Sequence, residues 1–354
     1  METMNALIMR DGSIGLESVE IPTPEKGQVL VKSLACGICG SDLHITHHAS
    51  EVFDLYRRLG IMSDAQDDHT GIMLGHEFCA EVVRHGPQTP QTHPVGSRVT
   101  CVPILMTQHQ AGIGVTPGVV GAYSEYFIVD EALLLAVPDG LPNEAAALTE
   151  PLAVGLHAVN RSAIQPGDVA LVAGCGPIGL AVIAALTRRG IETIVASDPN
   201  GLKRELAGTL GASHLANPAQ ENEVALASGV ASGQRVVIFE CIGIHTLIDA
   251  FIKRAPVGAR LVITGVHTTP SEIHYAYATV KELDLIFSYY YTAQEFAECL
   301  AVLGDGELAW QHLLTAKVGI DGVSGAFDEL TRNKDHIKVM IEPWRLGALE
   351  PFEP

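Results

Sequence analysis

A glycine-rich turn between two short apolar runs constrains this chain more than any other segment. Residues 169–173 form a β-prone apolar run that leads directly into Gly174-Cys175-Gly176-Pro177-Ile178-Gly179, a match to GxGxxG. Residues 180–189 are typical of a helix, residues 193–196 are typical of a second strand, and Asp198 follows at the expected separation. The strand, turn, helix, second strand and acid therefore occur in the order of a dinucleotide-binding βαβ unit.

Each residue of this turn has a physical task. Gly174 permits the tight turn, Gly176 allows the backbone to approach a pyrophosphate, and Gly179 lets the helix pack close to the sheet. The N-terminus of the helix that follows offers unpaired N–H groups and a positive dipole to phosphates, and Pro177 and Ile178 lie in the turn before it. We therefore predict that these five residues bind a cofactor. The alternative is a strand-turn-helix in which the glycines serve packing alone.

Asp198 predicts which nicotinamide cofactor binds. A carboxylate there accepts a hydrogen bond from a ribose 2′-OH and repels a 2′-phosphate, so NAD is favoured over NADP. The uncharged stretch at residues 169–186 has a length at the lower edge of what can span a bilayer. Its glycines, Pro177 and strand-like first half indicate a buried βα unit instead.

Composition restricts the classes of function. The chain has 354 residues, 47% of them hydrophobic and 18% charged, which is enough for two packed domains. A formal charge of -19 without a basic cluster argues against nucleic acid or anionic membrane as partners. Residues 1–18 have no export or organelle pattern, and the seven cysteines are an odd number that argues against a disulfide framework. The cytoplasm is the expected location.

The N-terminal part alternates short apolar runs with glycines and prolines, which is typical of a β-rich domain. Two connections in it carry metal-ligand residue types, Cys36-Gly37-Ile38-Cys39-Gly40-Ser41-Asp42-Leu43-His44 and Gly75-His76-Glu77. A structural zinc site would need a second CxxC pair, which Cys79 and Cys101 do not supply. The cysteine pair alone therefore defines no site.

Six motifs follow one another along nearly the whole chain. They are CGICGSDLH at 36–44, GHE at 75–77, GAYSEY at 121–126, EPLAVGLHAV at 150–159, the glycine turn, and FECIG at 239–243. In this order the chain resembles the zinc-dependent medium-chain alcohol dehydrogenase family. The resemblance implies an α/β fold with a GroES-like β-rich catalytic domain at 1–154 and a doubly wound, parallel-sheet Rossmann domain that binds NAD at 155–292. Residues 293–354 would return to the catalytic domain.

The resemblance also implies one catalytic zinc ion per chain, because residues 101–126 lack the four-cysteine lobe of many family members. By motif position the ligands would be Cys39, His76 and Glu150, with Glu77 a neighbour that could exchange onto the metal. Such a site keeps one coordination position open for substrate. The alternatives are buried structural roles for Cys39 and His76 and a helix-start role for Glu150. The choice between Glu77 and Glu150 as the third ligand stays open.

Three residues beside the cysteine pair are implied to act in catalysis. Asp42 would orient His76 through the second ring nitrogen, and a turn-forming Asp is the alternative. Ser41 would take the alcohol proton and pass it through the cofactor ribose to His44. A surface histidine is the alternative for His44.

Residues 45–73 form a longer connection than many family members have. Residues 51–59 place apolar side chains on one helical face that ends at Gly60, whereas residues 63–70 are typical of a polar loop. We expect either a wall over the substrate or a surface decoration. His47 and His48 match no motif and are expected to be solvated.

Beyond the glycine turn, four residues are predicted to contact the cofactor. Lys203 matches a family position near the adenosine ribose. Cys241, Ile242 and Val266 follow two further strands, where open α/β sheets bind ligands. Packing or solvation alone could explain each of them. Ser288 replaces an Arg common in polyol-oxidising relatives, which weakens sorbitol as a substrate.

These features together predict an enzyme that transfers hydride reversibly between a secondary alcohol, such as a polyol or vicinal diol, and NAD. The expected partners are a small alcohol or carbonyl compound and further copies of the chain, in a homodimer or homotetramer. Two alternatives remain. One is a metal-free quinone or enoyl reductase of the same superfamily, and the other is a non-catalytic NAD-binding protein.

Overall fold

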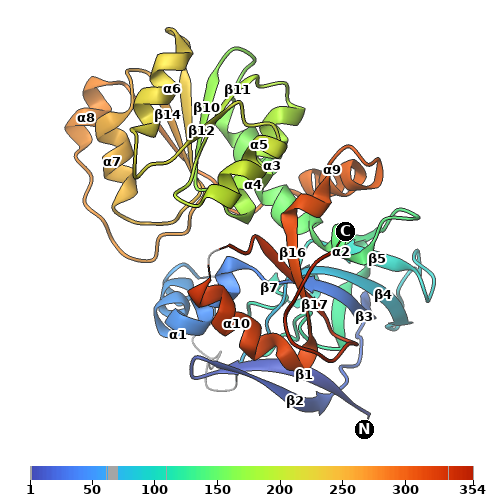
Figure 1. Cartoon of the computed structure of the whole chain (residues 1–354). Coiled ribbons are helices and arrows are strands. Elements are labelled where there is room, and N and C mark those ends of the chain that lie inside the picture. Colours follow the sequence, from blue (N-terminus) through green and yellow to red (C-terminus); the bar gives the residue numbers. More distant parts are fainter. Residues whose placement is uncertain (1, 61, 63–70, 109, 334, 354) are drawn as a thin grey trace. The chain divides into compact units, whose positions relative to one another are not determined.

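Two compact units make up the chain in the computed structural model, which describes residues 2–60, 62, 71–108, 110–333 and 335–353. Unit 1 comprises Met1–Glu150 and Phe296–Pro354, and unit 2 comprises Pro151–Glu295. Unit 1 is rich in β-strands and unit 2 contains a parallel sheet with helices (Figure 1). The predicted α/β fold class is therefore confirmed. Within the described ranges, no helix combines the length and apolarity needed to cross a bilayer.

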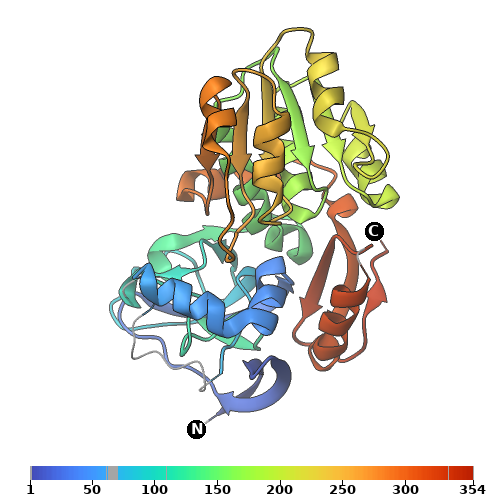
Figure 2. The same ribbon diagram turned by 90° about the vertical axis from the view of Figure 1, so that its left-hand side faces the viewer.

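Unit 2 is built on a six-stranded parallel sheet with the order β12-β11-β10-β13-β14-β15. Its strands are β10 (Val169–Ala173), β11 (Thr193–Ser197), β12 (His214–Ala216), β13 (Val236–Glu240), β14 (Arg260–Ile263) and β15 (Asp284–Phe287). Its helices are α4 (Pro177–Arg188), α5 (Gly201–Thr209), α6 (Glu223–Ala231), α7 (Leu247–Arg254) and α8 (Tyr275–Val280). Figure 2 shows helices against both faces of this sheet. Because both faces are covered, every residue of β10 and β13 is buried.

The glycine turn lies at the point where the strand order reverses, between β10 and β13. Open α/β sheets bind ligands at the carboxyl ends of strands at such a point. The helix after the turn begins three residues earlier than predicted, because Pro177 suits the first helical position. Gly174 has φ +92°, and a Cβ on Gly179 would lie 1.8 Å from the carbonyl oxygen of Gly174. Only glycines therefore allow this close packing.

Unit 1 contains an eight-stranded sheet with the order β18-β16-β17-β3-β4-β5-β9, in which β8 also pairs with β3. The strands of this sheet are β3 (Gln28–Gly37), β4 (Glu77–His85), β5 (Arg98–Cys101), β8 (Tyr126–Asp130), β9 (Leu134–Ala136), β16 (Leu314–Gly319), β17 (Lys338–Glu342) and β18 (Glu350–Pro351). Two smaller sheets pair β1 (Thr3–Arg10) with β2 (Ser13–Glu20) and β6 (Ile104–Leu105) with β7 (Ala111–Gly112). The helices are α1 (Gly40–Arg58), α2 (Asn143–Ala147) and α10 (Val323–Arg332). Helices α3 (Thr149–Ser162) and α9 (Ala293–Gly304) contain the two crossings between the units.

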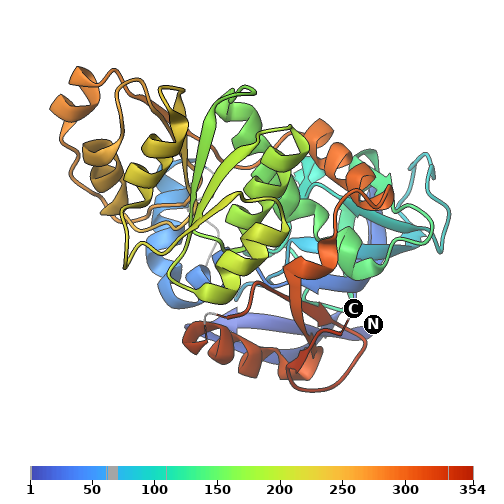
Figure 3. The same ribbon diagram turned by 45° about the horizontal axis from the view of Figure 1, so that its top comes forward.

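The returning C-terminal segment completes unit 1. Strand β17 pairs antiparallel with β3, so that Met340 lies opposite Gly37 and Ile341 opposite Cys36. Helix α10 packs beside β2, and Figure 3 shows this red segment next to the blue N-terminal strands. Phe327 of α10 shares one hydrophobic core with Leu7 of β1. Residues far apart in the sequence therefore build the part of unit 1 that surrounds the end of β3.

Helix α1 begins directly after Cys39 and is longer than the predicted helix at 51–59. Its first turn is capped because the Asp42 carboxylate accepts a hydrogen bond of 2.9 Å from the Cys39 N–H. The helix kinks at His48, where φ is -137° and ψ is 35°. The predicted polar loop at 63–70 lies outside the described residues. The last sheet strand is also shorter than predicted, since β15 spans Asp284–Phe287 and not 281–291.

Candidate metal and cofactor sites

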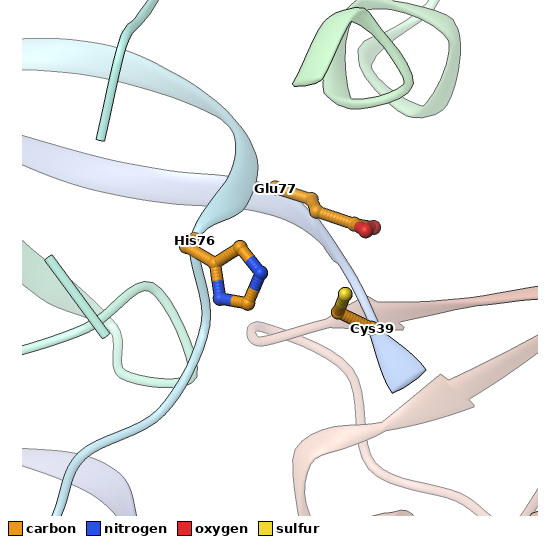
Figure 4. A group of neighbouring side chains, drawn as sticks. All are labelled: Cys39, His76 and Glu77. Atoms are coloured by element: carbon orange, nitrogen blue, oxygen red, sulfur yellow. The ribbon is translucent and has the colours of Figure 1, made fainter. Parts of the chain in front are cut away.

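Three residue types that bind metals converge in unit 1 (Figure 4). Gly37 at the end of β3 lies opposite Glu77 at the start of β4, and this pairing brings the adjacent Cys39 and His76 together. The donor atoms of Cys39, His76 and Glu77 all lie within 4.8 Å of one another, and Figure 4 shows their side chains grouped. Thiolate, imidazole and carboxylate are the ligands that zinc takes in proteins. The donor set therefore fits one zinc ion.

Glycine is required at two positions around this cluster. A Cβ on Gly37 would lie 2.1 Å from Oε2 of Glu77, so any side chain there would displace the carboxylate. Gly75 has φ +102°, and a Cβ there would lie 2.5 Å from the ring of Tyr123. The backbone on both sides of the cluster thus makes room for buried side chains.

Asp42 connects the start of α1 to His76. Its side chain is fully buried, and Oδ1 lies 3.5 Å from Nδ1 of His76. Its second oxygen, Oδ2, accepts hydrogen bonds from the Tyr123 hydroxyl at 2.6 Å and the Cys39 N–H at 2.9 Å. A carboxylate beside Nδ1 favours the tautomer that leaves the Nε2 lone pair for a metal. The structure thus brings Asp42 to the ring that it was predicted to orient.

Ser41 and His44 follow on the same helix. The Ser41 hydroxyl lies 3.4 Å from Nε2 of His76, on the ring nitrogen opposite Asp42. His44 is half-buried one turn further along α1. Burial lowers the pKa of His44, and the nearby His48 lowers it further. Ser41 is exposed and lies beside the candidate metal donors, whereas His44 is half-buried and lies further along the helix.

Glu77 has a charged partner that sequence reasoning missed. The Lys338 ammonium lies 2.6 Å and 2.7 Å from the two carboxylate oxygens of Glu77 and donates to the Ile38 carbonyl at 3.1 Å. The side chains of Lys338 and Glu77 are only 2% and 1% exposed. Burial disfavours the ammonium, but Glu77 raises the pKa of Lys338 above its ordinary value. The charge of Glu77 is thus already balanced without a metal.

Glu150 is the other candidate for the third ligand. It is buried in the first turn of α3, with 7% of its surface exposed. Burial lowers the pKa of His76, but Asp42, Cys39 and Glu150 raise it, so that the pKa lies well above its ordinary value. The Glu150 charge also raises the pKa of Lys338. Glu150 therefore adds negative charge to the same pocket, which favours a cation there.

Two features of the sequence could have drawn attention to Lys338 and Tyr123 as residues of the site. Lys338 is the one charged residue within the apolar run Ile337-Lys338-Val339-Met340-Ile341, and a lone charge in a buried strand usually has a partner. Tyr123 lies inside the GAYSEY motif. Neither signal identifies the partner, because Glu77 and Asp42 are distant in the sequence.

The predicted cofactor residues of unit 2 gather at the carboxyl edge of its sheet. A Cβ on Gly176 would meet nothing within 4 Å, so the backbone there faces open space that a phosphate could enter. Asp198 joins two turns, since Oδ2 accepts from the Cys175 N–H at 2.9 Å and Oδ1 accepts from the Asn200 N–H at 2.8 Å. Lys203 lies in the first turn of α5, where its N–H is capped by Asn200.

Cys241, Ile242 and Val266 lie at the same edge. A Cβ on Gly174 would lie 2.7 Å from Ile242, so this side chain borders the glycine turn. Burial raises the pKa of the Cys241 thiol to about 12, and its sulfur accepts a hydrogen bond from Thr264 at 3.2 Å. Ile242 and Val266 are 42% and 56% exposed. These apolar surfaces offer packing area for an aromatic ring.

A buried carboxylate that the sequence did not single out orders this edge. Glu240 is 1% exposed at the end of β13. Its Oε1 accepts hydrogen bonds from the N–H groups of Ile242 and Gly243, at 2.8 Å and 2.7 Å. Its Oε2 lies 3.0 Å from Nε2 of His267. Glu240 therefore holds the loop that carries Cys241 and Ile242.

Comparison with known proteins identifies the family. The model described as "Alcohol dehydrogenase GroES-like domain" matches residues 25–139, and that described as "Zinc-binding dehydrogenase" matches residues 177–305. The chain is 32% identical over 344 residues to (R,R)-butanediol dehydrogenase of Bacillus subtilis (strain 168), an alignment that covers 93% of this chain and 96% of the relative. The chain belongs to the zinc-dependent medium-chain alcohol dehydrogenase family.

Two further members of this dehydrogenase family are similar over the full length. A sorbitol dehydrogenase of Bacillus subtilis (strain 168) is 28% identical over 366 residues, which cover 97% of this chain and 98% of the relative. The crystal structure of 2R,3R-butanediol dehydrogenase from Bacillus subtilis is 31% identical, with a TM-score of 0.84 over 96% of this chain and 99% of that chain. The chain is thus an oxidoreductase that acts on CH–OH groups. The predicted enzyme class and the predicted cofactors, zinc and NAD, are therefore confirmed.

Proposed function

We propose that this medium-chain dehydrogenase oxidises a secondary hydroxyl group of a small vicinal diol with NAD and one zinc ion, and catalyses the reverse reduction. The convergence of Cys39 and His76, with Glu77 beside them, carries the proposal, because the donor atoms of these three residues lie within 4.8 Å of one another. The relatives named for butanediol and sorbitol support an alcohol with neighbouring hydroxyl groups. Ser288 in place of an Arg favours the diol over sorbitol.

In this proposal three side chains hold the metal. Cys39, His76 and Glu150 would be the ligands, while Lys338 keeps Glu77 nearby as a neutralised neighbour. This assignment is supported by charge, because Glu77 already has a buried cation and Glu150 is the remaining acid whose charge reaches His76. When bound, zinc polarises the alcohol oxygen and NAD accepts hydride from the adjacent carbon.

The start of α1 would manage the proton that the alcohol loses. Ser41 lies on the Nε2 side of His76 and would accept this proton from the alcohol. His44, half-buried and further along α1, would release it to water. Asp42 would keep the His76 ring in one orientation through the cycle.

Unit 2 would hold NAD through its backbone. Gly174, Gly176 and Gly179, with Pro177 and Ile178, would bind the pyrophosphate at the start of α4. Asp198 would accept a hydrogen bond from a ribose hydroxyl group. Its two oxygens already fix the turns at Cys175 and Asn200, so the carboxylate is held in place before the cofactor arrives. The contacts of Lys203, Cys241, Ile242 and Val266 with NAD are part of the same proposal.

Purified protein tests this proposal directly. Zinc content and NADH formation would be measured with butane-2,3-diol stereoisomers, sorbitol, primary alcohols and aromatic alcohols, and with NAD and NADP. We expect one zinc ion per chain, a preference for NAD, and a higher kcat/KM for a vicinal diol than for sorbitol. A metal-free protein that reduces quinones or enoyl compounds, or a zinc-loaded protein inactive on every alcohol, would refute it.

We also propose that two chains pair through the edge of the unit 2 sheet. Strand β15 pairs only with β14, so its other edge has no partner within the described part of the chain. Val280, Phe287 and Tyr289 beside this edge are 81%, 64% and 65% exposed. An apolar sheet edge is a template for pairing with a second strand. Light scattering on a sizing column should give a dimer or tetramer for the wild type and a smaller species for Phe287→Asp, whereas a monomeric wild type would disprove the proposal.

The cytoplasm remains the proposed location. All seven cysteines are free, and four of them are buried in unit 1 or partly so. Free thiols persist in reducing compartments. Fractionation of cells that produce the protein would test this assignment.

A further inference from the structure

A histidine-rich face of α1 lies outside the zinc cluster. His44 and His48 are four residues apart, and Glu51 follows three residues after His48. Side chains at separations of three and four lie on one side of a helix. The helix kinks at His48, so Glu51 belongs to the next segment, yet its charge still acts on His44. Two imidazoles are therefore neighbours at the surface of unit 1, and the Glu51 carboxylate acts on one of them through its charge.

The two rings are spaced as a shared ion requires. The ring centres of His44 and His48 are 4.9 Å apart, and the ring planes are inclined by 41°. Two imidazoles that bind one tetrahedral zinc ion, with Zn–N bonds of about 2.1 Å, have ring centres about 5 Å apart. The distance between the ring centres thus matches that of two imidazoles on one ion. His48 and Glu51 are exposed and His44 is half-buried, so an ion in solvent can reach them.

The lowered pKa of His44 favours the neutral form of its ring, which is the form that can bind a metal. Burial lowers its pKa, and His48 and His47 lower it further, although Glu51 acts in the opposite direction. A neutral imidazole is the form that binds metals. His47 is directed elsewhere, since its Nε2 lies 3.3 Å from the Thr331 hydroxyl of α10. The pair that remains is His44 and His48.

We propose that His44 and His48 form a second, exchangeable site for a zinc-class divalent cation, with Glu51 as an anionic neighbour and water as the remaining ligands. The site would be weaker than the cluster of Cys39, His76 and Glu77, because it offers two neighbouring rings and not three donor atoms that are already grouped. An ion bound here would occupy a ring nitrogen of His44. If His44 releases the substrate proton, as the proposed function states, excess zinc would slow turnover. Only this last consequence rests on the proposed function.

Calorimetric titration of the zinc-loaded enzyme with Zn²⁺ tests the site without measuring activity. We expect the wild type to bind one additional ion per chain. His48→Ala should bind it at least about tenfold more weakly, because even loss of a group that supports a ligand costs 10–100-fold. His312→Ala, which removes an exposed histidine of unit 1, should bind like the wild type. No additional ion in the wild type, or equal affinity in His48→Ala, would overturn the proposal.

Chemical modification locates the ion independently. Diethylpyrocarbonate would be applied to the zinc-loaded enzyme with and without excess Zn²⁺, and modified peptides would be quantified by mass spectrometry. Excess Zn²⁺ should protect His44 and His48 but not His312, and unprotected His44 and His48 would overturn the proposal. Protection without inhibition would support the site while refuting the proton-release role of His44. If excess Zn²⁺ protects both histidines and also inhibits the enzyme, and His48→Ala relieves this inhibition, the result would support both the site and the proton-release role of His44.

Discussion

The candidate metal cluster of unit 1 is held in place by side chains, whereas the glycine turn of unit 2 is held in place by its backbone. In unit 1, buried side chains position the donors, since Asp42 contacts His76 and Lys338 pairs with Glu77. In unit 2, backbone groups would form the phosphate site, and Asp198 stabilises the turn by accepting hydrogen bonds from backbone N–H groups. Zinc binding in unit 1 should therefore be sensitive to the loss of a buried charge. NAD binding in unit 2 should be sensitive to a Cβ added at the glycine turn.

The difference follows from what each ligand needs. A zinc ion is bound by side-chain donors, and buried charges are tolerated around it only when they are paired. A pyrophosphate is bound by N–H groups at a helix start, which requires close backbone approach and few side chains. Substitutions in one region should thus leave the other intact, and this independence can be tested.

The largest effect is expected for Cys39→Ala. Loss of a ligand should empty the metal site and lower kcat/KM by about 10⁴-fold, which is about 5.4 kcal/mol of transition-state stabilisation. Zinc analysis and steady-state kinetics measure both quantities. NAD affinity, followed by fluorescence titration, should stay unchanged because unit 2 is not altered. Cys79→Ala, at a buried cysteine outside the cluster, should retain zinc; full zinc content in Cys39→Ala would contradict the assignment.

Lys338→Met should have the next largest effect, on stability. It leaves Glu77 buried without a counter-charge, which costs about 3–5 kcal/mol of unfolding free energy. Urea unfolding of the holoenzyme measures this loss, and the double variant Lys338→Met/Glu77→Gln should recover most of it. Lys317→Met is the matched control, because Lys317 pairs with Glu144 in a more exposed position. Equal losses in the two lysine variants would show that the buried pair has no special role.

Gly174→Ala should affect the other region. A Cβ would be strained at φ +92° and would lie 2.7 Å from Ile242. A strain of about 1–2 kcal/mol at the cofactor edge should weaken NAD binding by roughly tenfold, while zinc content stays the same. Gly190→Ala provides the control, since Gly190 has φ +79° but open space around its Cβ position. If both variants bind NAD equally well, the turn does not bind the cofactor as proposed.

The smallest effect concerns a side-chain network inside unit 2. Burial raises the pKa of Glu295, but hydrogen bonds from Asn160, Thr292 and His157 outweigh it, so that the folded-state pKa is lowered from 4.5. Glu295 therefore stabilises the fold above pH 4.5, and this contribution is lost as the pH falls through its lowered pKa. Urea unfolding between pH 7 and about pH 3.5 should show a stability gap between wild type and Glu295→Gln that closes on acidification. Glu192→Gln, at an exposed position, should show no such gap.

Local patterns predicted much of this architecture. The bounds of β10 match the predicted strand, because an apolar run that ends in glycines has few other conformations. The motifs that resemble the family likewise led to Cys39 and His76, and each of these residues lies where a strand of the same antiparallel pair meets its connection. Contiguous signals of this kind need no knowledge of distant partners.

Other features depend on contacts that no local pattern contains. Lys338 and Glu77 are 261 positions apart, and their pairing exists only because β17 joins the same sheet as β3 and β4. The first half of α1 was missed because Gly40 and the histidines are weak helix formers, and the Asp42 cap stabilises the helix start. Local propensity could not supply these tertiary contributions.

The position of Lys338 in the sequence also sets an order of events during synthesis. A growing polypeptide leaves the ribosome from its N-terminus, so Glu77 emerges before unit 2 and Lys338 only after it. Until then the Glu77 carboxylate has no buried cation, and the surrounding apolar layer cannot close over it without a large penalty. We therefore expect the pocket around Glu77 to close only after translation past residue 338, whereas the candidate nucleotide site can form as soon as residues 151–295 are free of the ribosome.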